Sequence, residues 1–196
     1  VYDSVRDNKP YDEFARELLT SSGSNFRVGP VNFHRAIQGR EAATIAEAVA
    51  LTFMGDRMGS WPAKRRTGMA AFFSRVGYKT TAEWKEEIVY LDPSVTEAFE
   101  AILPDGTTAR VAENEDPRKV FADWLIAPNN PWFARSIANR IWAWLLGRGL
   151  VHEPDDLRDD NPPSHPALLA HIEQKPVAGG YDRKRLQIAS AHVCTT

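Results

Sequence analysis

A paired helix-start signal occurs twice in the second half of the sequence, at Asp116-Pro117 and at Asn130-Pro131. An Asp or Asn oxygen accepts a hydrogen bond from the first helical turn, and proline fits the first helical position because it has no N–H to lose. After each pair, apolar residues recur at helical spacing, and Gly147 stands where the second pattern stops. The sequence therefore predicts one helix that starts at 117 and another over 131–146.

Helical periodicity also occurs in the first half, and a different pattern separates the two halves. Apolar stripes predict helices over 10–20, 31–38, 41–54 and 68–76. Residues 87–91, 99–103 and 107–111 are instead rich in β-branched and aromatic residues, and Pro104-Asp105-Gly106 favours a hairpin turn. We therefore expect one antiparallel sheet of about three strands.

The remaining elements follow the second helix. Residues 148–163 form a connection rich in Asp and Pro, and Ser164 is a candidate cap for a helix over 164–174 that Pro176 should end. A last helix is expected over 182–192. The fold class expected is mainly α, with two helical blocks and a small antiparallel β element between them. The expected domains are a helical segment over 1–79, the β element over 80–114 and a truncated helical segment over 115–196.

Composition and charge indicate which partners and cofactors to expect. Apolar residues make up 43% and charged residues 26%, and the net charge of −2 does not call for a nucleic-acid or anionic-membrane partner. The basic run over 64–66 is interpreted as a solvated loop, and no apolar run approaches the ~20 residues of a membrane span. The single cysteine, Cys194, excludes an internal disulfide, a Cys-rich zinc site, an iron–sulfur cluster and haem attachment, so no cofactor is predicted.

Longer motifs in the second half resemble those of a known family. They are Asp116-Pro117-Arg118, Asn130-Pro131-Trp132-Phe133-Ala134-Arg135, Asn139-Arg140-Ile141-Trp142, Leu146-Gly147-Arg148-Gly149-Leu150-Val151, Glu153-Pro154-Asp155-Asp156-Leu157-Arg158 and Asn161-Pro162-Pro163-Ser164-His165-Pro166. They resemble the start of the C-terminal domain of the planctomycete-type, cytochrome-associated family of unknown function. Weaker motifs over 9–14 and 50–55 resemble the end of its N-terminal domain, so the resemblance touches most of residues 1–173.

The resemblance implies part of a larger protein that is exported or periplasmic, although no signal peptide is visible. Many members carry a Cys-Xaa-Xaa-Cys-His cluster shortly after the position of Gly55. Here residues 56–62 contain no Cys or His, so a haem role does not transfer. Residues 187–196 no longer resemble the family, whose pattern continues through a longer helical region. A shortened helical domain would leave apolar surface uncovered, which predicts self-association.

Acidic residues concentrate in the connection after the second helix, at positions 153, 155, 156, 159 and 160. Such carboxylates could bind Ca²⁺, although their spacing is not that of an EF-hand, and the histidines show no metal-binding spacing. In a hydrolase, Glu153 and Asp156 would form a carboxylate pair and His165 would complete the acid–base set. Alternatively, ion pairs with arginines hold the loop in place.

Four polar residues are candidates for substrate binding: Asn139, Arg140, Arg158 and Asn161. A guanidinium can clamp a carboxylate or sulfate, but we favour an internal pair of Arg140 with Asp155 or Asp156, which lie close in sequence. The tryptophans at 124, 132, 142 and 144 could stack on sugars and are favoured as core residues. The leading hypothesis is a helical scaffold or interaction module, with a second copy, a polysaccharide or another protein as partner. A hydrolase of glycoside or ester bonds and a calcium-binding module are the alternatives.

Overall fold

A computed structural model of the chain describes residues 2–158, 160–182 and 184–185. These residues are mainly helical, with short antiparallel strands, which confirms the predicted fold class at that level. Among them, no helix is long and apolar enough to cross a membrane. The chain divides into two compact units, and each is described by itself. The predicted domain boundaries stay a prediction.

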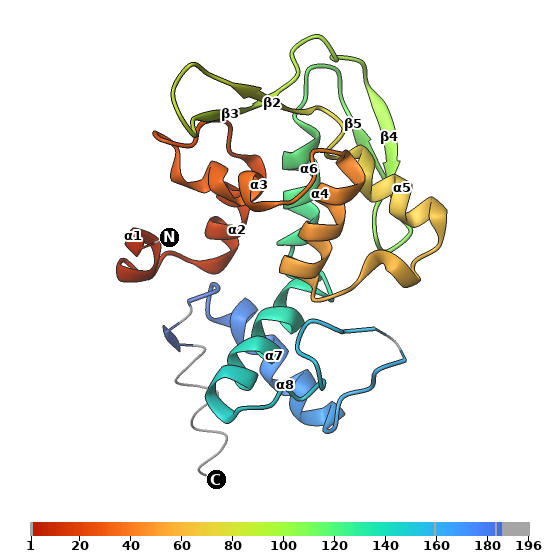
Figure 1. Ribbon diagram of the computed structural model, residues 1–196. Helices are drawn as coiled ribbons and strands as arrows, with labels where there is room; N and C mark the ends of the chain where they lie inside the picture. Colours follow the sequence, from red (N-terminus) through yellow and green to blue (C-terminus); the bar gives the residue numbers. More distant parts are fainter. Residues whose placement is uncertain (1, 159, 183, 186–196) are drawn as a thin grey trace. The chain divides into compact units, whose positions relative to one another are not determined.

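The first unit comprises residues 15–48 and 58–124 and contains all the strands found in the described residues. Its elements, labelled in Figure 1 where there is room, are the end of α2 (Tyr11–Thr20), β1 (Gly23–Ser24), η1 (Gly29–Val31), α3 (Asn32–Ala36), α4 (Ala42–Val49), η3 (Met58–Ser60), α5 (Ala63–Ala71), β2 (Val76–Thr80), β3 (Glu87–Leu91), β4 (Phe99–Ile102), β5 (Thr108–Val111) and α6 (Pro117–Leu125). Its core is aromatic, because the rings of Phe72 and Phe73 lie 5.6 and 5.4 Å from the ring of Phe121.

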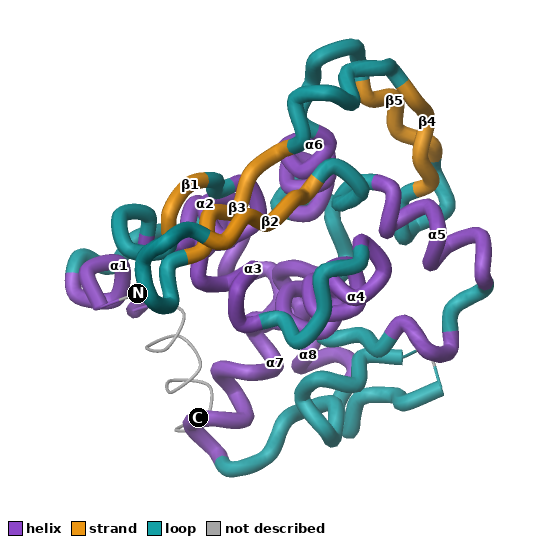
Figure 2. Tube along the Cα trace, turned by 45° about the horizontal axis from the view of Figure 1, so that its top comes forward, coloured by secondary structure: helices purple, strands orange, loops and turns teal. Residues whose placement is uncertain are grey.

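The strands form two sheets, so the prediction of one three-stranded sheet over 87–111 was wrong. β3 pairs antiparallel with β2 and with the short β1, as Figure 2 shows. β4 and β5 form the predicted hairpin, with Gly106 at φ +87° in its turn. The helix predicted over 68–76 was placed too late in the chain. α5 starts at Ala63, so the basic run lies in a helix rather than a loop, and Val76 already belongs to β2.

Arg118, near the start of α6, is buried and joins two distant segments of this unit. Its guanidinium donates to both carboxylate oxygens of Asp116 at 3.0 and 2.8 Å, to the Ser21 carbonyl at 3.0 Å and to Ser22 Oγ at 3.1 Å. Asp116 also accepts a hydrogen bond from the Arg118 backbone N–H at 3.0 Å, as its predicted capping role requires. One side chain therefore fixes the start of α6 to the segment that follows α2.

His34, in α3, is also fully buried. Its Nε2 lies 3.2 Å from the Leu19 carbonyl oxygen, so Nε2 carries the proton. Its Nδ1 has no hydrogen-bond partner in the described part of the chain. Burial, the largest cause, and the charge of Arg118 lower the pKa of His34 to about 4, against the opposing effects of the Leu19 carbonyl and Asp116.

We therefore expect acid to destabilise this fold through His34. Below its ordinary pKa of 6.5, the unfolded chain binds a proton that the folded state excludes until about pH 4. The free energy of unfolding should fall as the pH drops through this window, by about 2 kcal/mol between pH ~6.5 and ~5. Urea unfolding at several pH values measures the slope. His34→Gln should flatten it and the exposed control His171→Gln should not; an unchanged slope in His34→Gln would contradict this account.

The second unit comprises residues 2–14, 49–57 and 125–182 with 184–185. Its elements are α1 (Tyr2–Arg6), the start of α2, η2 (Ala50–Met54), α7 (Phe133–Leu146) and α8 (Pro166–Ala178). α7 and α8 pack against each other (Figure 1). Residues 2–14 contact both helices' surroundings through Tyr11. The Tyr11 ring stacks on Phe133 of α7 with ring centroids 5.1 Å apart, and the Tyr11 N–H donates to the carbonyl of Tyr181, which follows α8, at 3.0 Å. Asn8 Nδ2 donates to Asp182 at 2.8 Å.

The predicted end of α7 at Leu146 is confirmed, whereas its start at Phe133 lies two residues later than predicted. Asn130 Oδ1 accepts hydrogen bonds from the N–H groups of residues 132 and 133 at 3.0 and 3.1 Å, and Gly147 ends the helix at φ +78°. α8 differs from its prediction at both ends. Ser164 Oγ donates to the Leu150 carbonyl instead of capping, and the helix continues past Pro176 to Ala178. Most of the predicted helix over 182–192, and Cys194, lie outside the described residues.

Candidate functional site

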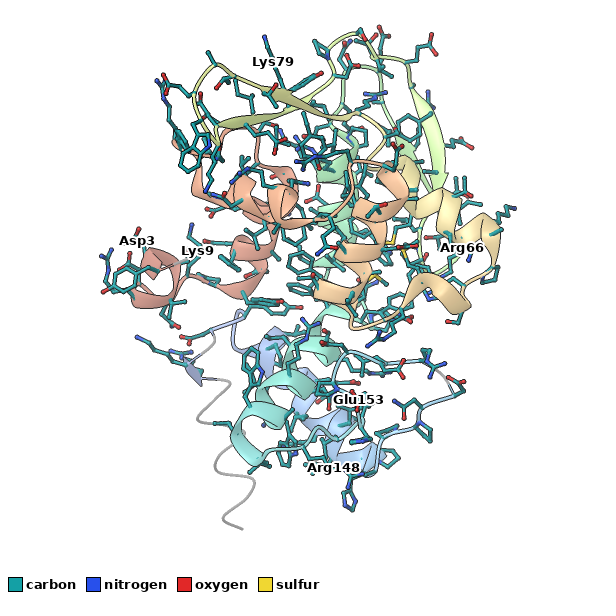
Figure 3. The ribbon with its side chains drawn as sticks, in the orientation of Figure 1. Asp3, Lys9, Arg66, Lys79, Arg148 and Glu153 are labelled. Atoms are coloured by element: carbon teal, nitrogen blue, oxygen red, sulfur yellow. The ribbon has the colours of Figure 1, made fainter. Side chains whose placement is uncertain are left out.

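The connection between α7 and α8, residues 148–163, carries most of the predicted site residues. Its described residues form no helix or strand, yet side chains fix it at several points. Figure 3 labels Arg148 near its start and Glu153 further along. The fixing groups come from α7, from η2 and from within the connection itself.

Asn139 of α7 is fully buried and holds the start of the connection. Its Nδ2 donates to the Val151 carbonyl at 3.2 Å, and its Oδ1 accepts from the Val151 N–H at 3.0 Å. Gly149 permits this close approach, because a Cβ at that position would lie only 2.4 Å from the Val151 carbonyl oxygen. The amide therefore satisfies both backbone groups of one buried residue, as a side chain with one donor and one acceptor can.

Arg140, the next residue of α7, joins the middle of the connection to η2. Its Nε donates to Asp155 Oδ1 at 2.6 Å, which confirms the predicted internal pair. Its two other nitrogens donate to the carbonyl groups of Leu51, at 2.6 Å, and of Thr52. Carbonyls in the last turn of a helix receive no hydrogen bond from the helix itself, and here the guanidinium of Arg140 provides the missing N–H donors. η2 then ends at Gly55 with φ +64°, and the Gly55 carbonyl accepts from the N–H of residue 157 at 2.8 Å.

A second arginine holds the acids that follow. Arg158 donates to both oxygens of Asp156 at 2.6 and 3.0 Å and lies 3.5 Å from Asp160. The hydrogen bond from Arg158 is the main reason that the pKa of Asp156 lies below its ordinary range. Asn161 Nδ2 donates to the carbonyls of His152 and Asp156 at 2.9 and 2.8 Å. The predicted ion-paired loop is therefore what the described residues form, and Asp159 lies outside them.

The three residues predicted as an acid–base set have different surroundings. Glu153 is exposed, at φ +59°, with its carboxylate 3.8 Å from His152 Nε2. Asp156 is held by Arg158, as above. His165 lies on an open hollow of about 540 Å³, and neither acid is among the described residues that line it: Trp142, Leu146, Arg148, Gly149, Leu150, Ser164, His165 and Leu168. Their catalytic role stays a prediction.

Of the four predicted substrate-binding residues, Arg158 and Asn161 lie together and the other two do not. Arg158 and Asn161 line a smaller hollow of about 190 Å³ together with Arg135, Val151, Leu157, Pro162, Pro163 and Leu169. Asn139 and Arg140 direct their polar atoms to backbone groups and to Asp155 instead. Within the described residues, no group of three or more His, Cys, Asp or Glu side chains could hold a metal ion.

The tryptophans of α7 do not share one environment. Trp142 is buried, as predicted, but Trp144 is 70% exposed, so its assignment to the core was wrong. Residues 144–146 are three consecutive apolar residues at the end of the helix, and successive helical side chains point in different directions. Leu145 and Leu146 are also exposed, at 46 and 47%. The last turn of α7 therefore carries an apolar surface.

Sequence reasoning missed two buried polar residues in this unit. Asp56 follows Gly55 and is 5% exposed, and its charge is among the causes that raise the pKa of Arg158, after those of Asp156 and Asp160. Ser136 of α7 is 1% exposed, and its Oγ has no hydrogen-bond partner in the described residues. An Asp after a helix-ending glycine is common in loops, and a Ser within a helix carries no signal, so neither could have been singled out.

Comparison with known proteins bears on the second half of the chain. No curated protein and no solved structure matches the chain. The N-terminal motifs, the planctomycete type and the cytochrome association of the resemblance stay predictions. Residues 117–189, which begin directly after Asp116 and include α6, α7 and α8, match the model of a family described as PSD1: Protein of unknown function (DUF1553). Over these residues the chain is similar to a family whose function is unknown.

Proposed function

We propose that the chain is a non-catalytic helical scaffold or interaction module. The observation that carries the proposal is the guanidinium of Arg140, which joins Asp155 to the carbonyls of Leu51 and Thr52. Charge-assisted bonds of this kind fix a loop in one geometry. Asp156 is similarly engaged by Arg158, and its lowered pKa keeps it deprotonated at neutral pH. The acid of a glycoside hydrolase needs the opposite shift, because it must hold a proton to donate.

An activity panel tests the proposal against the hydrolase alternative. The purified full chain is incubated with glycoside and ester substrates beside Glu153→Gln, Asp156→Asn and His165→Ala. We expect no turnover above the blank in any of the four proteins, because Arg158 holds Asp156 and neither acid lines the hollow on which His165 lies. Turnover that the variants lose, while the exposed control Lys64→Gln keeps it, would overturn the scaffold proposal.

The last turn of α7 provides an interaction surface for a second copy of the chain. Trp144 is exposed on the same turn as Leu146, and Leu146 lines the open hollow with Trp142 and Leu168. Exposed apolar side chains on one helical turn favour a two-fold contact between copies, because each copy can cover this turn of the other.

Sedimentation equilibrium tests this surface. We expect the full chain to dimerise with rising concentration and Trp144→Glu to remain a monomer, because the interface would have to bury an unpaired charge. Trp84→Ala, which removes an even more exposed tryptophan from the other unit, is the matched control and should dimerise normally. A monomeric wild-type chain at all concentrations would contradict self-association.

A further inference from the structure

Two turns in the unit that contains the sheets each expose an aromatic residue followed by a basic one. They are Phe26-Arg27, after β1, and Trp84-Lys85, between β2 and β3. The exposed fraction is 60% for Phe26 and 80% for Trp84, the most exposed large apolar side chain in the described residues. Burying such rings in an apolar environment is favourable, so their exposure in pairs points to a partner.

Hydrogen bonds fix the two turns to each other, and we refer to residues 24–27 and 81–86 together as the double turn. The Glu86 carboxylate accepts from Ser24 Oγ at 2.5 Å and from Thr81 Oγ1 at 2.7 Å. Asn25 N–H donates to the Glu87 carbonyl at 3.1 Å, and Asn25 Oδ1 accepts from the Glu87 N–H at 2.8 Å. β1 and β3 continue this pairing as adjacent strands (Figure 2). Both aromatic rings are therefore presented from one rigid support.

Exposed cations surround the two rings, whereas most of the nearby carboxylates are engaged by other residues. Arg27, Lys79 and Lys85 are exposed, and Figure 3 shows Lys79 projecting away from β2. The Lys85 Nζ lies 4.0 Å from the centroid of the Trp84 ring, so an ammonium and an apolar surface stand side by side. Two of the nearby acids are engaged, Glu86 by the hydroxyls named above and Glu87 by Arg40 at 2.8 Å. Glu83 is the exposed acid of the double turn.

We propose that the double turn binds the surface of anionic membranes, with Phe26 and Trp84 entering the headgroup region and Arg27, Lys79 and Lys85 facing lipid phosphates. Aromatic rings with a polar or cationic neighbour match the boundary between acyl chains and headgroups. Each exposed cation near such a surface strengthens binding by about fivefold. The inference goes beyond the proposed function and does not depend on it, because it uses neither residues 148–163 nor α7.

A single-stranded nucleic acid is the other polyanion that aromatic and basic residues can bind, and the geometry favours it less. Stacking of successive bases uses rings along a cationic groove. Here the two rings stand at two separate chain turns, and each is followed directly by a single cation, Arg27 or Lys85. Entry of two ring tips into a lipid surface needs no such continuous track.

Vesicle flotation of the full chain tests the proposal. The probes are vesicles of phosphatidylcholine alone and of phosphatidylcholine with phosphatidylserine at a ratio of about three to one. We expect binding to the anionic vesicles only, weakened by salt. Trp84→Ala should weaken it by about tenfold and Lys85→Gln by about fivefold, whereas Glu83→Gln should strengthen it.

The controls are matched to each change. Tyr2→Ala removes an equally exposed ring that lies 5.9 Å from the Arg6 guanidinium, and Lys64→Gln removes an exposed cation from α5; neither should alter binding. Equal binding to neutral vesicles, no binding at low salt, or unchanged binding in Trp84→Ala would each overturn the proposal. So would a labelled single-stranded oligonucleotide that binds through Trp84 while vesicles do not bind. Activity in the substrate panel would overturn the scaffold proposal alone and leave this one standing.

Discussion

Replacing Arg118 by Ala is expected to lower the free energy of unfolding by about 3–5 kcal/mol. The side chain is 2% exposed, and its removal leaves the Asp116 carboxylate, the Ser21 carbonyl and the Ser22 hydroxyl without their donor. The Asp116 side chain is only 12% exposed, and a carboxylate left without its charged partner in such a position costs several kcal/mol. Urea denaturation monitored by circular dichroism measures the change.

Two further variants make the Arg118 result specific. Arg118→Lys keeps the charge but cannot reproduce the forked geometry on Asp116, so it should recover only part of the loss. Arg110→Ala removes an exposed arginine from β5 in the same unit, and a change within about 0.5 kcal/mol is expected. A loss below about 1 kcal/mol in Arg118→Ala would show that the buried cluster is not what joins α6 to the segment after α2.

Replacing Arg140 by Ala is expected to cost about 2–4 kcal/mol, because three hydrogen bonds from one charged group disappear together. The change uncouples Asp155 from the Leu51 and Thr52 carbonyls. Beside the unfolding free energy, hydrogen exchange of the amides over 150–157 should accelerate, since the connection loses its middle fixing point.

The matched control for Arg140 lies on the same helix. Arg135 pairs with Glu173 at 2.8 Å, but its side chain is 42% exposed, so Arg135→Ala should cost less than about 1 kcal/mol. Exchange over 150–157 should stay slow in that variant. Equal losses in the two variants, or slow exchange in both, would mean that Arg140 does not fix the connection.

Local signals predicted local structure well. The hydrogen bonds that Asn130 accepts before α7 and the end of this helix at Gly147 were predictable, and the β4–β5 hairpin follows from a turn motif between two short strands. In each case the interacting groups lie within a few residues of each other, so propensity and capping are sufficient. The pairing of Arg140 with Asp155 was predictable for the same reason, because only one connection separates them.

Predictions failed where a distant partner decides the structure. β3 pairs with Gly23 and Ser24, more than sixty positions earlier in the chain, and a two-residue strand has no pattern of its own. Ser164 has the right residue type for a cap, but the Leu150 carbonyl takes its hydroxyl. The contact of Arg140 with η2 depends on two backbone carbonyls, which carry no side-chain signal at all. The sequence therefore could not predict all the contacts that hold residues 148–163 in place.

The second unit is assembled from three separate stretches of chain, and this constrains how it can form during synthesis. Residues 2–14 and 49–57 leave the ribosome before residues 133–181, in which Tyr11, Leu51 and Gly55 each have a partner. Until that later part emerges, these contacts of Tyr11 and of the end of η2 cannot form. Contacts so distant in sequence close slowly. The portion that matches the known family is accordingly expected to misfold when it is expressed without the earlier stretches, and it should be studied within the full chain.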